Sequence, residues 1–255
     1  MIHPALLLVA LGAALALMTV TWALSLVVRD ASIADIAWGP VFALIAWLSV
    51  LESDSLGVSL PVAILVSAWA ARLALHIALR HKGEDPRYAA MRKRRGAAFP
   101  IWSLASVFWL QAVLATVVAL PVIAATGRAG SSIPLIAGFA IAAAGLAFEA
   151  VADIQLTRFR GDPAGAGQVL DTGLWRYSRH PNYFGESVFW WGMWLGLAAS
   201  GATPVWTVIG PVLITGLLIR VSGVTLLERS ITSRRPGYAD YVQRTSAFVP
   251  RRPNP

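Results

Sequence analysis

Eight ionisable side chains fall within segments that are otherwise apolar enough to cross a membrane. They are Asp35, Arg72, His76, Glu149, Asp153, Glu186, Arg220 and Glu228. A charge at the centre of a bilayer costs roughly 2.5–3.5 kcal/mol on insertion scales, so such a residue normally faces the protein interior and has a partner. Any single one could lie near a helix end or in a structural ion pair. All eight together favour a polar, ligand-binding cavity inside a helical bundle.

The spacing of these residues sharpens the prediction. Arg72, His76 and Arg80 recur every four residues and so share one helix face, and Glu149 and Asp153 are also four apart. A basic helix and an acidic helix predict a polar seam. The seam could be a self-neutralising structural network or a water-accessible cavity open to the cytoplasm, and we favour the cavity.

Two polar segments could bind an anionic ligand. The segment 173–186 reads GLWRYSRHPNYFGE and combines donors, aromatic rings and a carboxylate. Pro181 suits the first position of a helix, which would direct the helix N-terminus toward an anion. Interfacial anchoring explains the aromatic and basic residues of this segment, but not the spacing of Asn182 and Glu186. Earlier in the chain, Arg87 and Tyr88 follow a proline and could bind a phosphate and stack on a ring.

The composition indicates which elements must position these side chains. Hydrophobic residues make up 57% of the 255 residues and charged residues 13%, against about 25% charged in typical globular proteins. A helix of about 20 apolar residues spans a bilayer. We therefore predict an all-α polytopic membrane protein, one seven-helix domain over residues 1–255 with a basic tail from about residue 229. The predicted spans are 4–28, 33–51, 59–80, 102–125, 133–157, 186–200 and 204–227.

The basic residues predict the orientation of these spans. Most of the 21 Lys and Arg residues fall in alternate loops, after the first, third, fifth and seventh spans. Positively charged loops stay in the cytoplasm, so the N-terminus should be outside and the C-terminus inside. The first span lacks a basic leader and a cleavage site and is expected to be a retained helix. The run Arg92–Arg95 is expected to be a plain cytoplasmic anchor.

Several chemistries are excluded by what the sequence lacks. Without cysteine there are no disulfides, thiolate metal sites or iron–sulfur clusters, and the four scattered histidines predict no metal site. The run Gly165-Ala166-Gly167 has no preceding strand and no third glycine, so it is not a dinucleotide fingerprint. Nothing indicates nucleic-acid binding despite the net charge of +8. No obligate protein partner is evident.

The run Arg179-His180-Pro181-Asn182-Tyr183-Phe184-Gly185-Glu186 resembles the cofactor-binding motif of the membrane steroid 5α-reductase family and its bacterial relatives. The resemblance extends over 33–39, 72–88, 149–160 and the tail, including Phe248-Val249-Pro250. The arginine–histidine–proline portion also occurs in isoprenylcysteine carboxyl methyltransferases, which use S-adenosylmethionine. Asn182, Glu186 and the seven spans favour the reductases.

This resemblance implies a helical bundle that holds NADPH in a cavity facing the cytoplasm, while a lipophilic substrate enters from the membrane. The residues that it implies for cofactor binding are Arg72, Arg87, Tyr88, Asp153, Arg160, Arg179, His180, Asn182, Tyr183 and Glu186. Arginines suit phosphates, carboxylates suit ribose hydroxyls and an amide suits the nicotinamide.

The family activates the substrate carbonyl with a glutamate and a tyrosine. Asp35 stands at the place of the glutamate, whereas Trp69 stands at the place of the tyrosine. An indole can donate one hydrogen bond but cannot transfer a proton. The resemblance therefore implies that Asp35, kept protonated by burial, polarises the carbonyl, and that Trp69 assists or shapes the pocket.

The expected reaction is NADPH-dependent reduction of a carbon–carbon double bond conjugated to a ketone, as in a 3-oxo-Δ4 steroid that yields its 5α-reduced product. One alternative is a membrane methyltransferase that uses S-adenosylmethionine. Another is a transporter or lipid-binding bundle, although no inverted repeat favours it. The expected location is the bacterial inner membrane.

Overall fold

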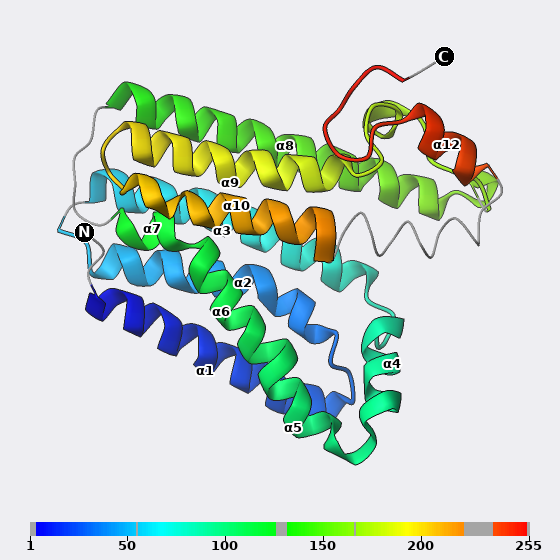
Figure 1. The fold of residues 1–255 in the computed structure, drawn as a ribbon, viewed down its shortest axis with the longest axis horizontal. Coiled ribbons are helices and arrows are strands. Elements are labelled where there is room, and N and C mark those ends of the chain that lie inside the picture. Colours follow the sequence, from blue (N-terminus) through cyan, green and yellow to red (C-terminus); the bar gives the residue numbers. More distant parts are fainter. Residues whose placement is uncertain (1–3, 55, 126–131, 166, 222–236, 254–255) are drawn as a thin grey trace. The chain divides into compact units, whose positions relative to one another are not determined.

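The computed structural model describes residues 4–54, 56–125, 132–165, 167–221 and 237–253. Every regular element in this part of the chain is a helix, as predicted (Figure 1). In chain order the α-helices are α1 (Pro4–Val28), α2 (Ile33–Leu51), α3 (Leu56–Arg80), α4 (Pro86–Arg95), α5 (Phe99–Ser103), α6 (Leu110–Val118), α7 (Leu120–Ala124), α8 (Ser132–Gly161), α9 (Pro181–Ala199), α10 (Ile209–Gly216) and α12 (Tyr238–Arg244). Two π-helical segments, Leu104–Trp109 and Leu217–Val221, continue α5 and α10.

Five helical stretches are long and apolar enough to cross a membrane, which indicates a membrane protein. They are Pro4–Val28, Ile33–Leu51, Leu56–Arg80, Pro86–Val118 and Ser132–Gly161. Helices also occupy the places of the last two predicted spans, α9 and the shorter apolar stretch Val205–Arg220. The count of seven spans and the orientation of the termini stay predictions. The tail from residue 229 falls outside the described residues as far as 236.

The chain divides into two compact units. Unit 1 comprises Met1–Leu135 and Leu197–Gly210, and unit 2 comprises Ile136–Gly196 and Pro211–Pro255. The single domain expected from the sequence stays a prediction.

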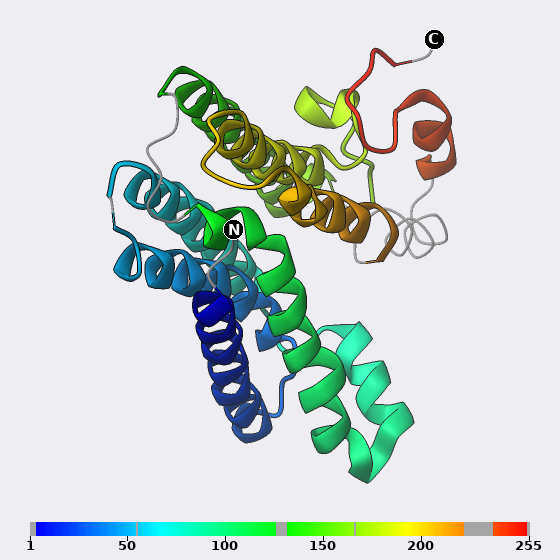
Figure 2. The same cartoon turned by 60° about the vertical axis from the view of Figure 1, so that its left-hand side comes forward.

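In unit 1, helices α1, α2 and α3 lie side by side, and α6 packs on α1 and α2 (Figures 1 and 2). Gly39 allows α2 and α3 to approach closely, because a Cβ at this position would lie 2.6 Å from the carbonyl oxygen of Ala70. Next to this contact, the Phe42 ring meets Trp38 and Trp69 edge to face, with ring centroids 5.0 and 5.2 Å apart. Large apolar side chains therefore form the core between these two helices.

In unit 2, α8 and α9 run antiparallel along a seam of glycines. A Cβ at Gly138 would lie 2.2 Å from Gly196, one at Gly145 would lie 2.5 Å from Phe189, and one at Gly185 would lie 2.6 Å from Glu149. These pairs advance along the two helices in opposite directions, which is the signature of an antiparallel register. Small residues at regular intervals let membrane helices bring their backbones together.

Candidate functional site

The acid and the phenol of the candidate site meet in unit 1. Asp35 lies in the first turn of α2, and the Tyr88 hydroxyl in the first turn of α4 donates to its Oδ1 at 2.6 Å. Arg87 Nη2 donates to the other carboxylate oxygen of Asp35 at 3.1 Å. Tyr88 is 7% exposed. The structure therefore joins Asp35, predicted to be catalytic, to two residues predicted to bind the cofactor.

Capping holds Arg87 and Tyr88 in place. Asp85 is the N-cap of α4, Pro86 follows at the first helical position, and Asp85 Oδ1 accepts from Arg87 N at 2.8 Å and from Arg87 Nε at 2.9 Å. Burial alone would raise the pKa of Asp85, but these side-chain and backbone hydrogen bonds from Arg87 outweigh it and lower the pKa. Arg87 is therefore fixed between Asp85 and Asp35.

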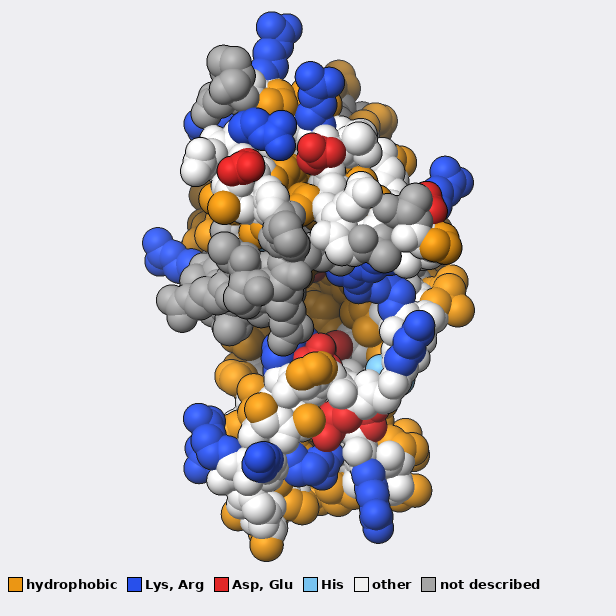
Figure 3. Space-filling view, turned by 90° about the vertical axis from the view of Figure 1, so that its right-hand side faces the viewer, with side chains coloured by type: hydrophobic (Ala, Val, Ile, Leu, Met, Phe, Trp, Pro, Cys, Tyr) orange, Lys and Arg blue, Asp and Glu red, His pale blue; other side chains and the backbone are white. Residues whose placement is uncertain are grey.

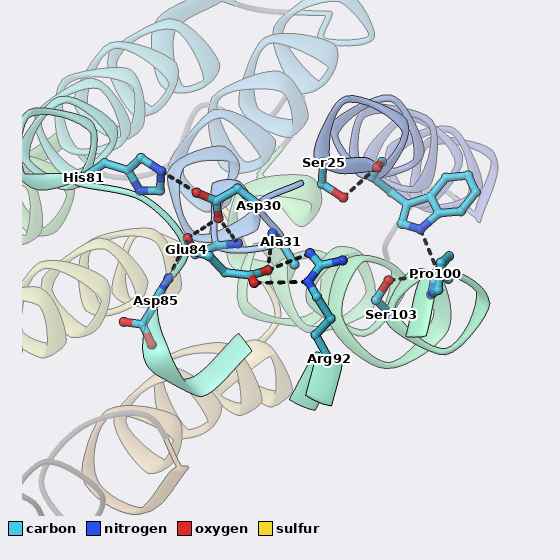
Figure 4. A network of polar contacts seen from close by, with 11 residues as sticks. Ser25, Asp30, Ala31, His81, Glu84, Asp85, Arg92, Pro100 and Ser103 are labelled. Atoms are coloured by element: carbon cyan, nitrogen blue, oxygen red, sulfur yellow. Dashed lines mark hydrogen bonds and ion pairs between the residues drawn. The ribbon is translucent and has the colours of Figure 1, made fainter. Parts of the chain in front are cut away.

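A second group of hydrogen bonds ties α4 to the turn between α1 and α2 (Figure 4). Glu84 Oε1 accepts from Ala31 N at 3.0 Å and from Arg92 Nη2 at 2.7 Å, and Glu84 Oε2 accepts from Arg92 Nε at 3.1 Å. Burial alone would raise the pKa of Glu84, but the hydrogen bonds from Arg92 and Ala31 lower it below its usual 4.5. The same turn carries Asp30, whose Oδ2 lies 2.8 Å from His81 Nε2.

A small pocket lies beside Tyr88. It has a volume of about 170 Å³ and is lined by Arg87, Tyr88, Met91, Trp102, Ser106, Val107, Leu110 and Gln111. Most of this lining is apolar or aromatic, and its polar groups belong to Arg87, Tyr88, Ser106 and Gln111. The buried Gln111 Oε1 has no hydrogen-bond partner among the described residues. The π-helical segment Leu104–Trp109 forms part of the wall, and π-bulges frequently occur at functional sites.

Trp69 belongs to the core rather than to the lining of this pocket. It is fully buried and its ring packs edge to face against Phe42. Both roles expected for Trp69, assistance to catalysis and shaping of the pocket, stay predictions.

The basic run at the end of α4 combines charge with aromatic stacking. Arg92 lies 4.4 Å from the Phe99 ring centroid and Arg95 lies 4.6 Å from that of Trp102. Lys and Arg side chains stand out at the end of unit 1 that carries α4 (Figure 3). Guanidinium groups are attracted to the faces of aromatic rings, and basic side chains are attracted to anionic lipid headgroups. The run therefore suits the expected anchor at a membrane surface.

Unit 2 holds the second cluster of predicted site residues. Asn182 Nδ2, in the first turn of α9, donates to Asp153 Oδ1 of α8 at 3.1 Å. Asp153, Glu149 and Glu186 are each 5% exposed or less. Helix α9 begins at Pro181, as the sequence predicts. The glycine seam brings these polar side chains together, since Gly185 lies between Asn182 and Glu186 and packs against Glu149.

Of the remaining residues of the arginine–histidine motif, Arg179 binds the C-terminal segment, and His180 and Tyr183 contact each other. Arg179 Nη1 donates to the carbonyl oxygens of Val242 at 3.0 Å and Thr245 at 2.6 Å, at the C-terminal end of α12. The rings of His180 and Tyr183 stack with centroids 5.5 Å apart. Arg179 therefore has a structural role in this structure, and cofactor binding by Arg179, His180 and Tyr183 stays a prediction.

Two further predicted cofactor residues lie on the long helices. Arg72 is partly buried on α3 and Arg160 is exposed near the end of α8. On the face predicted for Arg72, His76 Nε2 and Arg80 Nη1 lie 2.8 Å apart. The structure thus brings together Asp35, Arg87 and Tyr88 in unit 1, and Asp153 and Asn182 in unit 2.

The residues of unit 2 fit a dinucleotide. The Asn182 Oδ1 atom is buried and has no hydrogen-bond partner among the described residues, so a ligand hydroxyl or amide could satisfy it. Buried carboxylates beside it are suitable acceptors for ribose hydroxyls. No group of His, Asp or Glu that could hold a metal occurs among the described residues.

Fold and site together define an α-helical membrane protein with buried acids, an acid–phenol pair and a small, largely apolar pocket. The chain belongs to the family described as protein of unknown function DUF1295, whose model matches residues 21–245. The members are membrane proteins related to the steroid 5α-reductase-like proteins.

A stretch of 96 residues is 31% identical to an uncharacterised protein of Schizosaccharomyces pombe. The match covers 37% of this chain and 27% of that relative, so the chain spans about a quarter of the relative's length. No solved structure matches the chain.

Several residues of the site went unnoticed in the sequence. Asp30, His81 and Glu84 hold the acid–phenol pair from behind, and Gln111 lines its pocket. His81 and Glu84 lie in the segment 72–88 that the resemblance covers, but no pattern in the sequence gave a role to any of these four residues. The glycine seam did leave a signal, the seven-residue spacing of Gly138 and Gly145 and of Gly185 and Gly192.

Proposed function

We propose that this chain is an NADPH-dependent membrane oxidoreductase that reduces the carbon–carbon double bond of a lipophilic enone, such as a 3-oxo-Δ4 steroid. One observation carries the proposal. Tyr88 lines a pocket with a mostly apolar or aromatic lining, and its hydroxyl donates to Asp35, which also accepts from Arg87. A phenol beside a mostly apolar pocket is suited to polarise a carbonyl on a lipid-like molecule.

In this proposal Tyr88 rather than Asp35 meets the substrate oxygen. Tyr88 lines the pocket, whereas Asp35 stands behind the phenol at 2.6 Å. When Asp35 carries a proton, this contact can run from the carboxyl to the phenol oxygen, so that the phenol hydrogen is free for the substrate. Tyr88 thus provides the phenol that the resemblance would place at the position of Trp69.

NADPH would supply a hydride to the β-carbon, and a proton from the Tyr88–Asp35 pair or water completes the saturated ketone. The residues proposed to bind NADPH are Asp153, Asn182 and Glu186, all in unit 2. Their support is the buried, unsatisfied Asn182 Oδ1 next to two buried carboxylates. The bacterial inner membrane and a site open to the cytoplasm belong to the same proposal.

Cofactor binding is tested by titrating the purified full-length chain in detergent with NADPH and with S-adenosylmethionine. We expect NADPH to bind and Asn182→Ala to weaken it. Gln155→Ala is the matched control, because Gln155 lies on α8 near Asp153 but accepts from Leu174 N instead. Binding of S-adenosylmethionine alone would indicate the methyltransferase, and binding of neither would favour a transporter or lipid-binding bundle.

The role of the phenol is tested by turnover of a 3-oxo-Δ4 steroid, followed by loss of NADPH absorbance and by mass spectrometry of the product. Tyr88→Phe should lower kcat by about 10²–10⁴-fold, the usual contribution of a positioned proton donor. Its affinity for NADPH should stay unchanged. Full activity of Tyr88→Phe would remove the phenol from the mechanism.

A further inference from the structure

The N-termini of α2 and α4 are joined at their caps. Ser32 precedes α2 and Asp85 precedes α4. The Asp85 N–H donates to Ser32 Oγ at 3.2 Å. Three residues beyond each cap, Asp35 and Tyr88 meet at 2.6 Å. Since three residues are nearly one helical turn, the bond between the caps and the acid–phenol bond link the same two first turns.

Asp30 determines how Ser32 takes part in this junction. Asp30 Oδ1 accepts from Ser32 N at 2.9 Å and from Ser32 Oγ at 2.5 Å (Figure 4). A serine hydroxyl has one hydrogen to donate and two lone pairs that accept. Because its hydrogen is directed to Asp30, the Ser32 oxygen presents a lone pair to the N–H of Asp85.

The Asp30–Ser32 side of the junction is buried, and the bond from Asp85 N to Ser32 Oγ is partly buried. Asp30 and Ser32 are 7% and 4% exposed. His81, one residue beyond α3, contacts the second oxygen of Asp30 at 2.8 Å. Water therefore competes little for these bonds, and loss of one would leave a buried donor or acceptor unsatisfied.

We infer that Ser32, oriented by Asp30, is a positioning residue that sets the register of Tyr88 against Asp35. Its significance for turnover rests on the proposed function, but the geometric relation does not. Ser32 is not itself part of the pocket lining, and its hydrogen bond to Asp85 lets it act through the first turn of α4.

The experiment measures the environment of the Tyr88 ring directly. The full-length chain is labelled with 3-fluorotyrosine and its ¹⁹F spectrum is recorded in detergent. The chain has five tyrosines, and Tyr88→Phe assigns the resonance. Asp35→Asn provides the reference for a weakened acid–phenol bond. We expect Ser32→Ala to move the Tyr88 resonance in the same direction as Asp35→Asn, and Ser32→Thr, which keeps a hydroxyl, to restore most of it.

Ser25→Ala is the matched control. Ser25 is equally buried in unit 1, but its hydroxyl donates within α1 to the carbonyl oxygen of Trp22 at 2.7 Å, so the Tyr88 resonance should not move. Asp30→Asn gives a second test if Ser32→Ala does not fold, because it changes the acceptor with little change of shape. If the Tyr88 resonance does not move in Ser32→Ala, the inference is overturned. If Ser32→Ala does not fold, an unmoved resonance in Asp30→Asn overturns it instead.

The outcome is separable from that of the proposed function. In an active enzyme, Ser32→Ala should lower kcat and leave the affinity for NADPH unchanged. If the resonance moves but NADPH does not bind, the proposed function fails and the positioning inference stands. If NADPH binds but the resonance stays in place, the inference fails alone.

Discussion

Replacement of Gly185 by alanine should force α8 and α9 apart. A Cβ at Gly185 would lie 2.6 Å from the Glu149 nitrogen, and 2.8 Å from both the Glu149 Cβ and the Gly145 carbonyl oxygen. None of these atoms can rotate away, because they belong to the backbone or to a Cβ. The strain must therefore be relieved by movement of a whole helix.

The magnitude follows from that geometry. Ordinary contact begins near 3.4 Å, so the two backbones must separate locally by roughly 0.8 Å, and the dispersion contacts along the seam weaken with distance. Overpacking of this kind costs typically about 1–3 kcal/mol. For a chain of this size, that corresponds to a fall in Tm of about 2–12 °C.

The assay is thermal unfolding in detergent, monitored by circular dichroism or by intrinsic tryptophan fluorescence. Gly12→Ala is the matched control, because a Cβ at Gly12 on α1 would meet nothing within 4 Å. It should leave Tm unchanged or raise it slightly, since alanine is the better helix former. An equal Tm for Gly185→Ala and the wild type would refute the close-packed seam.

Three further outcomes are expected. The pKa of Glu84 is lowered in the folded chain. The ionised Glu84 therefore stabilises the fold above pH 4.5, and this stabilisation is lost as the pH falls through the pKa of the folded state. Glu84→Gln should flatten the decline of Tm between about pH 5 and 3, measured by scanning fluorimetry. Arg179→Ala should speed hydrogen exchange in 238–250 while α1–α3 keep their protection, as it removes donors from Val242 and Thr245. Trp69→Phe should lower the free energy of unfolding by less than the roughly 3–5 kcal/mol expected for truncation to alanine, and it should leave the affinity for NADPH unchanged. A loss of that affinity would show that Trp69 does more than pack in the core.

Local features of the sequence predicted much of the fold. The first two spans, 4–28 and 33–51, coincide with α1 and α2, because a predominantly apolar run between polar residues determines both the helix and its length. Pro181 starts α9, as its fixed φ angle favours. Helices α3 and α8 are longer than the third and fifth predicted spans. Helix α3 begins earlier, at Leu56, and α8 continues through the polar residues Arg158 and Arg160 to Gly161.

The contacts of the site could not be predicted in the same way. Tyr88 and Asp35 are 53 residues apart in the chain, and neither residue's local sequence identifies the other as its partner. The resemblance grouped Arg87 and Tyr88 with cofactor residues, whereas the structure joins both to Asp35. What determines this pairing is the junction of two helix caps, which arises only when α2 and α4 are packed.

The position of Tyr88 has a consequence for how the pocket recognises a ligand. On the long helix α3, a phenol would be held rigidly by the bundle core, as Trp69 is against Phe42. Tyr88 instead sits on the ten-residue helix α4, which side-chain bonds through Ser32 and Glu84 attach to the turn before α2. A short helix held by a few side-chain bonds can shift as a unit when those bonds are altered. The geometry of the acid–phenol pair should therefore be more sensitive to the polar residues of that turn than to the apolar core.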